Sequence, residues 1–322
     1  MRRTTRPTPA RLIAGLSAIV LPLSVTACSS GDAETAAGPE SIESIGLLVQ
    51  DMSNPFFSAM DRGLQQAAEE IGATANTQDA QLDLGTQTSQ MDAFIQQGVD
   101  LIVVSAVDQD GIEPAIQRAK QAGIIVIAVD TPAVGADAVV ETDAVQAGET
   151  SCTYLFEQLG GQGNVLLVDG TPIQTIIDRI EGCKNVAQNF PGIKIVGQQA
   201  SENDRASGLA VTTDMLTATP DVQGIFGMND PSALGAVLAV EQAGIAGQVK
   251  VTGVDGSPEA VDELKRAGSP FIGTATQAPG EMVRRAVELA QQMVSGEEIA
   301  ETHIRIPSEL VTRDNVNEYA GW

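Results

Sequence analysis

The segment LIVVSAVD (residues 101–108) is a short β-branched run that ends in polar residues, and it opens a pattern that the chain repeats. It leads into a helical stretch ending at QAGI (121–124) and a strand ending at AVDTP (128–132). The second copy opens at GIFGMND (224–230), and there the helix ends at QAGI (242–245) and the strand at GVDGSP (253–258). The repeat indicates two lobes that are built in the same way.

Apolar runs of strand length alternate with amphipathic, helix-length stretches from Ser44 onward. The runs predict buried parallel strands over Ile45–Val49, Leu101–Val104, Ile124–Val129, Val165–Val168, Ile193–Val196, Gly224–Phe226 and Val249–Val254. The spacing of apolar residues predicts helices over Phe57–Ile71, Ile112–Ala122, Gln146–Leu159, Ala206–Thr217 and Ser232–Ala243. This alternation is typical of a doubly wound α/β sheet.

Polar residues follow several of these strands. Asp130, Asn229 and Asp255 stand at carboxyl ends, where open α/β sheets bind their ligands, so the three side chains would meet if the two lobes face each other. Directly after the first strand, Asn54-Pro-Phe-Phe57 places two of the chain's seven phenylalanines side by side. Their rings either pack in the core behind a helix that Pro55 opens, or offer their faces to the apolar face of a sugar ring.

The first 28 residues have the pattern of an export signal. Four arginines precede an uncharged, mainly apolar run from Leu12 to Val25, which is shorter than the roughly 20 apolar residues that span a bilayer. The ending Val-Thr-Ala-Cys28 resembles a bacterial lipobox, so we expect residues 1–28 to be a lipoprotein signal peptide and Cys28 to carry the lipid. The alternative is ordinary cleavage that leaves an unmodified thiol. Residues 29–43 are poor in large apolar residues and are expected to form a flexible tether.

The exported part is strongly acidic. Removing the four signal arginines changes the formal charge from −24 to −28, which argues against nucleic acid as a partner. Cys152 and Cys183 fall in predicted helices of one lobe and either form a disulfide outside the cytoplasm or remain buried free thiols. We expect no metal site, because the single histidine, His303, has no ligand residues near it in the sequence, and no cofactor.

Six motifs carry a resemblance to a known family. They are SNPFF (53–57), VDT (129–131), DRIEG (178–182), MNDPSALG (228–235), GVDGSP (253–258) and ATQ (275–277). From about Ser44 to about Pro307 the chain resembles the ribose-binding type of periplasmic binding protein, the sugar-binding component of ABC importers. The resemblance implies the type I fold, in which two doubly wound parallel-sheet lobes are joined by a three-segment hinge with the ligand cleft between them.

The family's connectivity implies where the lobes divide in this chain. The N-terminal lobe is expected to hold residues 44–144 and 278–306, and the C-terminal lobe residues 145–277 and 307–322. The crossings are expected near Asp143–Gln146, Thr276–Pro279 and Ile306–Ser308, and a helix over about Glu281–Ser295 is expected to complete the first lobe. Ligand binding would close such a hinge.

The resemblance also implies the ligand contacts. The hydroxyl ligands would be Asn54, Asp130, Arg179, Asn229, Asp255 and Gln277, with Phe56 and Phe57 as stacking rings. Carboxylates accept hydrogen bonds from vicinal hydroxyls, a guanidinium donates a planar fork, and amides do both. Taken alone, Asp255-Gly256 is equally consistent with a simple turn, and Arg179 with an exposed helix residue.

Two site positions depart from the ribose type. Thr131 stands where the family usually has an arginine, and Asn203 where it has an aromatic residue. The change at Thr131 removes a charged donor, and the change at Asn203 replaces a stacking face with an amide. These departures favour another neutral monosaccharide or polyol, for example a ketose such as fructose, over ribose.

The resemblance further implies the partners. They would be the permease and ATPase of an ABC importer. The protein itself would be exported and anchored through the Cys28 lipid to the outer face of the cytoplasmic membrane, and it would be a monomer. A ligand-sensing subunit for a membrane receptor kinase is the alternative that the sequence leaves open. An enzyme is not expected, because no Ser-His-Asp or Cys-His arrangement is available around His303.

Overall fold

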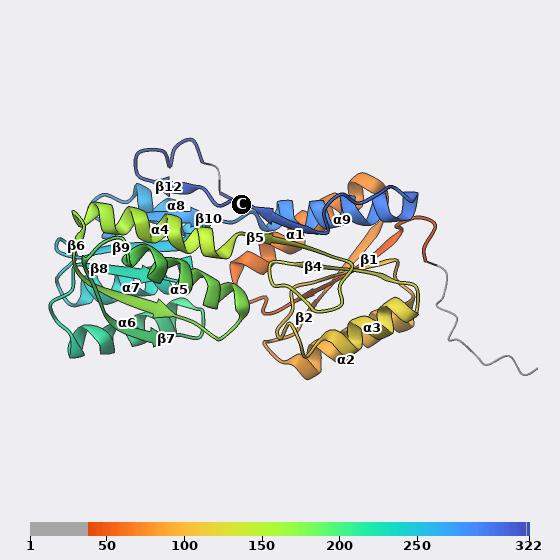
Figure 1. Cartoon of the computed structure of the whole chain (residues 1–322), viewed down its shortest axis with the longest axis horizontal. Helices are drawn as coiled ribbons and strands as arrows, with labels where there is room; N and C mark the ends of the chain where they lie inside the picture. Colours follow the sequence, from red (N-terminus) through yellow and green to blue (C-terminus); the bar gives the residue numbers. More distant parts are fainter. Residues whose placement is uncertain (1–37, 320) are drawn as a thin grey trace, which may run out of the picture. The chain divides into compact units, whose positions relative to one another are not determined.

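The computed structural model describes residues 38–319 and 321–322, so the predicted signal peptide, Cys28 and most of the predicted tether lie outside the described residues. Two six-stranded sheets organise the described chain, with strand orders β11-β5-β4-β3-β1-β2 and β12-β10-β9-β8-β6-β7. The strands pair in parallel except β10 and β12, which are antiparallel. Each sheet is the centre of one lobe (Figure 1).

The first lobe combines the start of the described chain with a later segment, α9 and β11. Its elements are β1 (Ser44–Val49), α1 (Pro55–Ile71), β2 (Thr74–Asp79), α2 (Leu84–Gln97), β3 (Leu101–Val104), α3 (Glu113–Gln121), β4 (Ile125–Val129), β5 (Ala138–Thr142), α9 (Pro279–Ser295) and β11 (His303–Ile306). All four residues of β3 are buried, and their side chains alternate between two apolar clusters. The first cluster packs against α1 and α9 and the second against α2 and α3, so helices cover both faces of the sheet.

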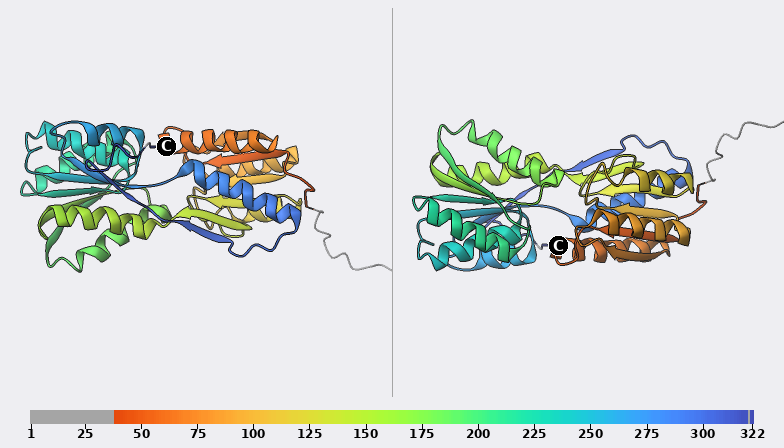
Figure 2. Two further views of the ribbon diagram at one scale, coloured as in Figure 1. Left: turned by 90° about the horizontal axis from the view of Figure 1, so that it is seen from above. Right: turned by 90° about the horizontal axis from the view of Figure 1, so that it is seen from below.

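The second lobe has the same layers. Its elements are α4 (Ala144–Gln158), β6 (Gln162–Asp169), α5 (Gln174–Ala187), β7 (Gly192–Ala200), α6 (Arg205–Ala218), β8 (Gly224–Gly227), α7 (Asp230–Gln242), β9 (Lys250–Asp255), α8 (Pro258–Lys265), β10 (Phe271–Thr276) and β12 (Leu310–Thr312). Helices α4 and α5 pack on one face of the sheet, and α6, α7 and α8 on the other. Figure 2 shows this layering and the connections that run between the lobes.

A disulfide joins Cys152 of α4 to Cys183 of α5, with their Cα atoms 5.2 Å apart. Of the two possibilities that the sequence left open for these cysteines, the structure therefore has the bonded form. Gly148 and Gly182 allow the same two helices to approach closely, because a Cβ at Gly148 would overlap the backbone carbonyl of Arg179, and one at Gly182 the carbonyl of Val145. The position of α5 is thus fixed by both a covalent bond and close backbone packing.

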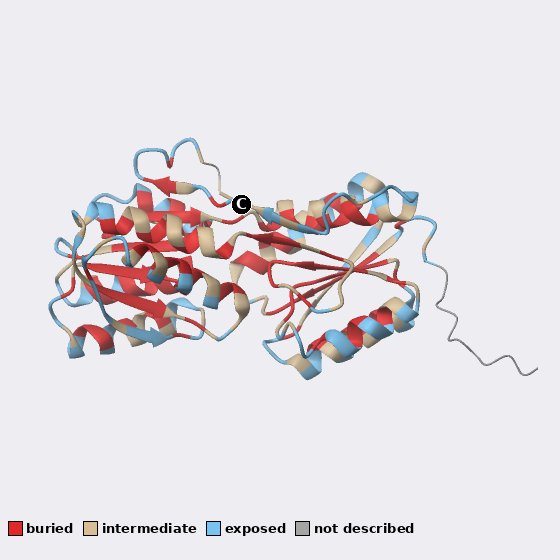
Figure 3. Cartoon of the chain, viewed as in Figure 1, coloured by how far each residue is buried: buried red, intermediate tan, exposed pale blue. Residues whose placement is uncertain are grey.

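Strand β7 differs from its prediction. The run Ile193–Val196 is predicted as a buried strand, but β7 is the edge of the second sheet, and Ile195 and Val196 are 36% and 37% exposed. A shift in register opposite Val165 and Leu166 interrupts its alternation, and Figure 3 shows the strand largely exposed. An edge strand pairs on one side only, so β-branched composition alone does not report its burial.

Three segments connect the lobes, as the resemblance implies, and they are hydrogen-bonded to one another. They join β5 to α4, β10 to α9, and β11 to β12. The Gln146 side chain donates to the Ser308 carbonyl at 3.0 Å and accepts from the Ser308 N–H at 2.7 Å. The Ser308 hydroxyl donates to the Thr276 carbonyl at 2.8 Å, so the three crossings form one connected hinge.

Contact with the first lobe begins at Ile42, inside the region predicted as tether. Ile42 is buried in the first apolar cluster, and the Glu43 N–H donates to Asp100 Oδ2 at 2.9 Å. Across residues 38–319 and 321–322, the longest apolar helical stretches fall short of what a bilayer crossing requires.

Candidate functional site

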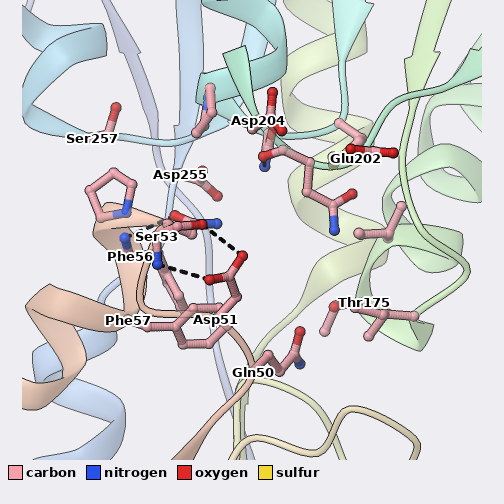
Figure 4. Close-up of a pocket in the computed structure, with 18 of the residues that line it drawn as sticks. Gln50, Asp51, Ser53, Phe56, Phe57, Thr175, Glu202, Asp204, Asp255 and Ser257 are labelled. Atoms are coloured by element: carbon pink, nitrogen blue, oxygen red, sulfur yellow. Dashed lines mark hydrogen bonds between the residues drawn. The ribbon is translucent and has the colours of Figure 1, made fainter. Parts of the chain in front are cut away.

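The carboxyl ends of the two central sheets border a cavity of about 380 Å³ between the lobes. This volume is in the range of cavities that hold small molecules. The first lobe lines it with Gln50, Asp51, Ser53, Asn54, Pro55, Phe56, Phe57, Leu82 and Asp130. The second lobe lines it with Ile173, Thr175, Ile176, Arg179, Glu202, Asn203, Asp204, Arg205, Met228, Asn229, Pro231, Leu234, Asp255, Ser257, Glu259 and Gln277, the last of which directly follows β10. Figure 4 shows labelled side chains of both groups around this cavity.

The turn after β1 positions the first-lobe polar groups. Asp51 accepts hydrogen bonds from the Ser53 N–H at 2.9 Å and from the Ser53 hydroxyl at 2.7 Å, which fixes the loop (Figure 4). The side-chain oxygen of Asn54 caps α1 by accepting from the Phe56 N–H at 2.9 Å, and Pro55 occupies the first helical position. Asn54 is held at the cavity with its amide nitrogen, a hydrogen-bond donor, not used by the cap.

Phe56 and Phe57 pack in the core and also border the cavity. The rings are 3% and 5% exposed and belong to the first-lobe core, and they also line the cavity. They meet edge to face with centroids 5.3 Å apart, and Phe56 makes a second edge-to-face contact with Trp322 at 5.9 Å. Their orientation is therefore fixed by packing before any ligand arrives.

Asp130 is the buried carboxylate of the first-lobe side. It follows β4 with φ of 62°, and its Oδ2 accepts from the Ser105 hydroxyl at 3.1 Å. Burial raises the pKa of Asp130 to about 6, and the opposing attraction of Arg179 only partly offsets this rise. The buried carboxylate of Asp130 is poorly solvated when it is charged. A ligand that donates hydrogen bonds to its oxygens would therefore be favoured.

Thr131 is the one predicted ligand residue that does not line the cavity. It is buried, and its hydroxyl accepts from the Gln50 side chain at 2.8 Å. Gln50 also donates to the Ala106 carbonyl at 3.0 Å, and Gln50 itself lines the cavity. Thr131 instead holds Gln50, which directly follows β1 and which the carboxyl-end rule used for Asp130 would have found. Contact of Thr131 itself with a ligand stays a prediction.

Arg179 and Asp255 form the buried ion pair of the second-lobe side, with 3.4 Å between Arg179 Nη1 and Asp255 Oδ1. Arg179 also donates to the Met228 carbonyl at 3.0 Å, and Gln277 donates to Asp255 Oδ1 at 2.8 Å. Burial raises the pKa of Asp255 despite the nearby guanidinium. Among the residues that the structure describes, the buried Arg179 Nε has no hydrogen-bond partner. Both residues line the cavity, where a guanidinium donor beside a carboxylate acceptor suits a ligand with several hydroxyl groups.

Asn203 and Asn229 are joined to each other. Asn203 accepts from the Thr171 N–H at 2.9 Å and donates to the Thr171 hydroxyl at 2.7 Å, so its amide fastens the loop after β6. Asn229 donates to the Asn203 carbonyl at 2.9 Å and caps α7 through the Ser232 N–H. Both residues line the cavity, as predicted, and their side chains also hold its wall in place.

Strained backbone gathers at this cavity. Five described residues other than glycine have positive φ, and four of them line it, namely Leu82, Asp130, Asn203 and Asp255. Asp255 is the most extreme, with φ of 139°. Such conformations persist only where the surrounding structure enforces them, and they cluster at functional sites.

The lining is acidic. Six carboxylates (Asp51, Asp130, Glu202, Asp204, Asp255 and Glu259) and two guanidinium groups (Arg179 and Arg205) border the cavity. Nowhere in residues 38–319 and 321–322 do three His, Cys, Asp or Glu side chains form a group that could hold a metal ion. The charge balance disfavours anionic ligands, and the mixture of acceptors, donors and two aromatic rings fits a neutral polyhydroxyl compound.

Comparison with known proteins agrees with this geometry. Residues 45–298 match the family model described as periplasmic binding protein domain. The chain is 30% identical over 305 residues to the ribose import binding protein of Bacillus subtilis, covering 92% of this chain and 98% of the relative. It is also 30% identical over 302 residues to the xylitol-binding protein of Mycolicibacterium smegmatis, covering 92% of this chain and 83% of the relative.

A solved structure is similar in fold as well as in sequence. An ABC transporter periplasmic solute binding protein from Actinobacillus succinogenes, with bound D-allose, superposes with a TM-score of 0.82 at 31% identity, covering 86% of this chain and 100% of the other. The match spans both lobes and the hinge. The chain therefore belongs to the periplasmic binding proteins, in the ribose-binding type of sugar-binding protein that serves ABC importers.

Proposed function

We propose that this protein binds one neutral monosaccharide or polyol between its lobes and delivers it to the permease and ATPase of an ABC importer. The observation that carries the proposal is the cavity, to which both lobes contribute hydroxyl-binding groups: Asn54 and Asp130 from the first, and Arg179, Asn229, Asp255 and Gln277 from the second. A ligand that contacts both lobes binds most tightly when they face each other, so its binding energy closes the hinge. The two lobes would be residues 44–144 with 278–306, and 145–277 with 307–322.

The ligand class follows from the groups at the cavity. Thr131 stands where the ribose type usually has an arginine, and it holds Gln50, so the first-lobe side offers the amide of Gln50 and the carboxylate of Asp130 to the ligand. Relatives named for ribose and xylitol, and a structural neighbour with bound D-allose, support a pentose, hexose or alditol and do not single out one. We favour a ketose such as fructose or a sugar alcohol over ribose.

A thermal-shift screen tests the ligand class. The panel would contain D-ribose, D-allose, D-fructose, xylitol and myo-inositol, with D-gluconate and glutamate as charged comparisons. A ligand present at 100 times its dissociation constant adds about 2.7 kcal/mol to the free energy of unfolding. We expect at least one neutral polyol to raise the melting midpoint and D-gluconate to leave it unchanged, because the lining is acidic. Stabilisation by a charged compound alone would refute the proposal.

We further propose that the protein is exported and held on the outer face of the cytoplasmic membrane by a lipid on Cys28, as a monomer. Labelling cells with a radioactive fatty acid would mark the unchanged protein and leave Cys28→Ser unlabelled. Uptake of the labelled sugar by cells that lack this gene would separate delivery to an importer from a role in sensing. Uptake that did not depend on the protein would favour the receptor kinase alternative.

A further inference from the structure

The segment after β12 packs along the second lobe. Val316 is buried in the apolar cluster of that lobe, and Tyr319 packs against the same cluster. The Tyr319 hydroxyl donates to the Gly256 carbonyl at 3.0 Å, at the turn between β9 and α8. This bond lies directly beside Asp255, so the segment is fastened to the second lobe at the edge of the ligand cavity.

Trp322 extends this attachment to the first lobe. Its ring is partly buried against the first-lobe core, where it meets Phe56 edge to face with centroids 5.9 Å apart and planes at 87°. Its indole Nε1–H donates to the backbone carbonyl of Asp255 at 2.8 Å. Figure 1 places the end of the chain, marked C, between the two lobes. A single side chain therefore contacts one cavity-lining residue from each lobe.

These two contacts act on groups that must be oriented to bind a ligand. Phe56 makes edge-to-face contacts with both Phe57 and Trp322, which leave its ring little freedom to turn. Asp255 has φ of 139°, a conformation that its surroundings must enforce. The Asp255 carbonyl oxygen accepts from two donors, the Gln277 N–H and the Trp322 indole N–H, each at 2.8 Å. Trp322 therefore adds a second hydrogen bond that holds the backbone of the residue whose carboxylate pairs with Arg179.

We propose that Trp322 is a positioning residue of the ligand site. It bridges Phe56 of the first lobe to the Asp255 backbone of the second, and so stabilises the arrangement in which the two lobes face one ligand. The inference rests on the proposed function in one respect only, namely that this cavity holds the ligand. Its structural part, the bridge between the lobes, can be tested without any ligand.

Three variants separate the two contacts of Trp322. Trp322→Phe keeps an aromatic edge against Phe56 and removes the N–H donor, while Trp322→Ala removes both contacts. Tyr319→Phe is the matched control, because it deletes a hydrogen bond to the neighbouring Gly256 carbonyl within the second lobe alone. Tyr319→Phe and Trp322→Phe are conservative changes, so they remain informative even if the alanine variant folds poorly.

The first measurement is the distance between the lobes in ligand-free protein. Spin labels on Glu69→Cys in α1 and Asp214→Cys in α6, both at exposed positions, report it by pulsed electron resonance in a Cys28→Ser background. We expect Trp322→Ala to broaden the distance distribution toward larger values and Tyr319→Phe to leave it as in the parent. Identical distributions for the parent and Trp322→Ala, or equal broadening by Tyr319→Phe, would overturn the bridge.

The second measurement is affinity, by calorimetric titration with D-ribose, D-allose, D-fructose, xylitol and myo-inositol. The loss of one hydrogen bond and one aromatic contact should weaken binding by about 10-fold in Trp322→Ala, with Trp322→Phe in between and Tyr319→Phe near the parent. Unchanged affinity in Trp322→Ala would refute the positioning role. If none of the five compounds binds the parent, the proposed function is what fails, and the ligand-free distances still decide the bridge.

Discussion

Asp130→Asn should make the protein more stable at neutral pH and weaken its binding of ligand. The carboxylate of Asp130 is buried beside the Ser105 hydroxyl, with no cation in contact with it among the described residues. Burial raises its pKa from the ordinary 3.8 to about 6, so its charged form is penalised in the folded protein. Asparagine has nearly the same shape, retains an oxygen that can accept from Ser105, and carries no charge to bury.

The size of the effect follows from the raised pKa. An acid whose pKa is higher in the folded protein contributes stability that is complete below pH 3.8 and is lost as the pH rises through about 6. The loss amounts to about 3 kcal/mol at pH 7.5 and about 1 kcal/mol at pH 4.5. The asparagine variant does not titrate here, so its advantage over the parent should grow by about 2 kcal/mol between these two pH values.

Scanning calorimetry of the ligand-free protein at pH 4.5 and 7.5 measures this difference. At pH 7.5 the melting midpoint of Asp130→Asn should exceed that of the parent by about 5 °C. Asp110→Asn is the matched control, because it removes the same charge from an exposed loop and should give similar midpoints at both pH values. A midpoint for Asp130→Asn at or below the parent's at pH 7.5, or a difference independent of pH, would refute the reasoning.

Three further predictions concern the second lobe and its supports. Arg179→Met should abolish binding of the stabilising polyol and lower the free energy of unfolding by about 3 kcal/mol, because Asp255 loses its buried countercharge. Calorimetry measures the binding and urea titration the free energy of unfolding. Retained binding would contradict the assignment of Arg179 to the site. Gly148→Ala should destabilise the protein and weaken binding, since its Cβ would overlap the carbonyl of Arg179, whereas Gly247→Ala, with open space around it, should do neither. Reducing the Cys152–Cys183 disulfide, which closes a 31-residue separation, should lower the unfolding free energy by about 3–4 kcal/mol, and an unchanged midpoint in dithiothreitol would argue against the bond.

The architecture could be predicted from the sequence where apolar pattern and burial coincide. The runs of β1, β3, β4, β6, β8 and β9 are apolar because the strands are covered on both faces. Strand β2 gave no such signal, because its sequence TANTQD is polar and it lies at an edge of the first sheet. Strand β7 contains a β-branched run that predicts burial, yet the strand lies at an exposed edge of the second sheet. An edge strand is held by hydrogen bonds to its single neighbouring strand and need not be buried. The apolar pattern of a sequence reports burial and not pairing, so it does not identify such strands reliably.

The site was predictable as far as the carboxyl ends of strands and the family motifs reach. Asp130, Arg179, Asn229, Asp255 and Gln277 all line the cavity. The direction of a side chain within a loop could not be predicted from the sequence. The Thr131 hydroxyl is bonded to the Gln50 side chain, and it is Gln50, not Thr131, that lines the cavity.

The way the first lobe is completed sets an order on folding. Helix α9 covers one face of the first sheet and β11 forms its edge, yet both are encoded after nearly all of the second lobe. A chain emerging from the ribosome N-terminus first therefore cannot close the core of its first lobe until residue 306 has been made. Contacts of such long sequence separation form slowly, so the first lobe stays incomplete until synthesis of the chain is almost finished. A fragment that stops after β5 keeps α1 but lacks α9, so it should leave part of one sheet face exposed and remain a target for chaperones and proteases.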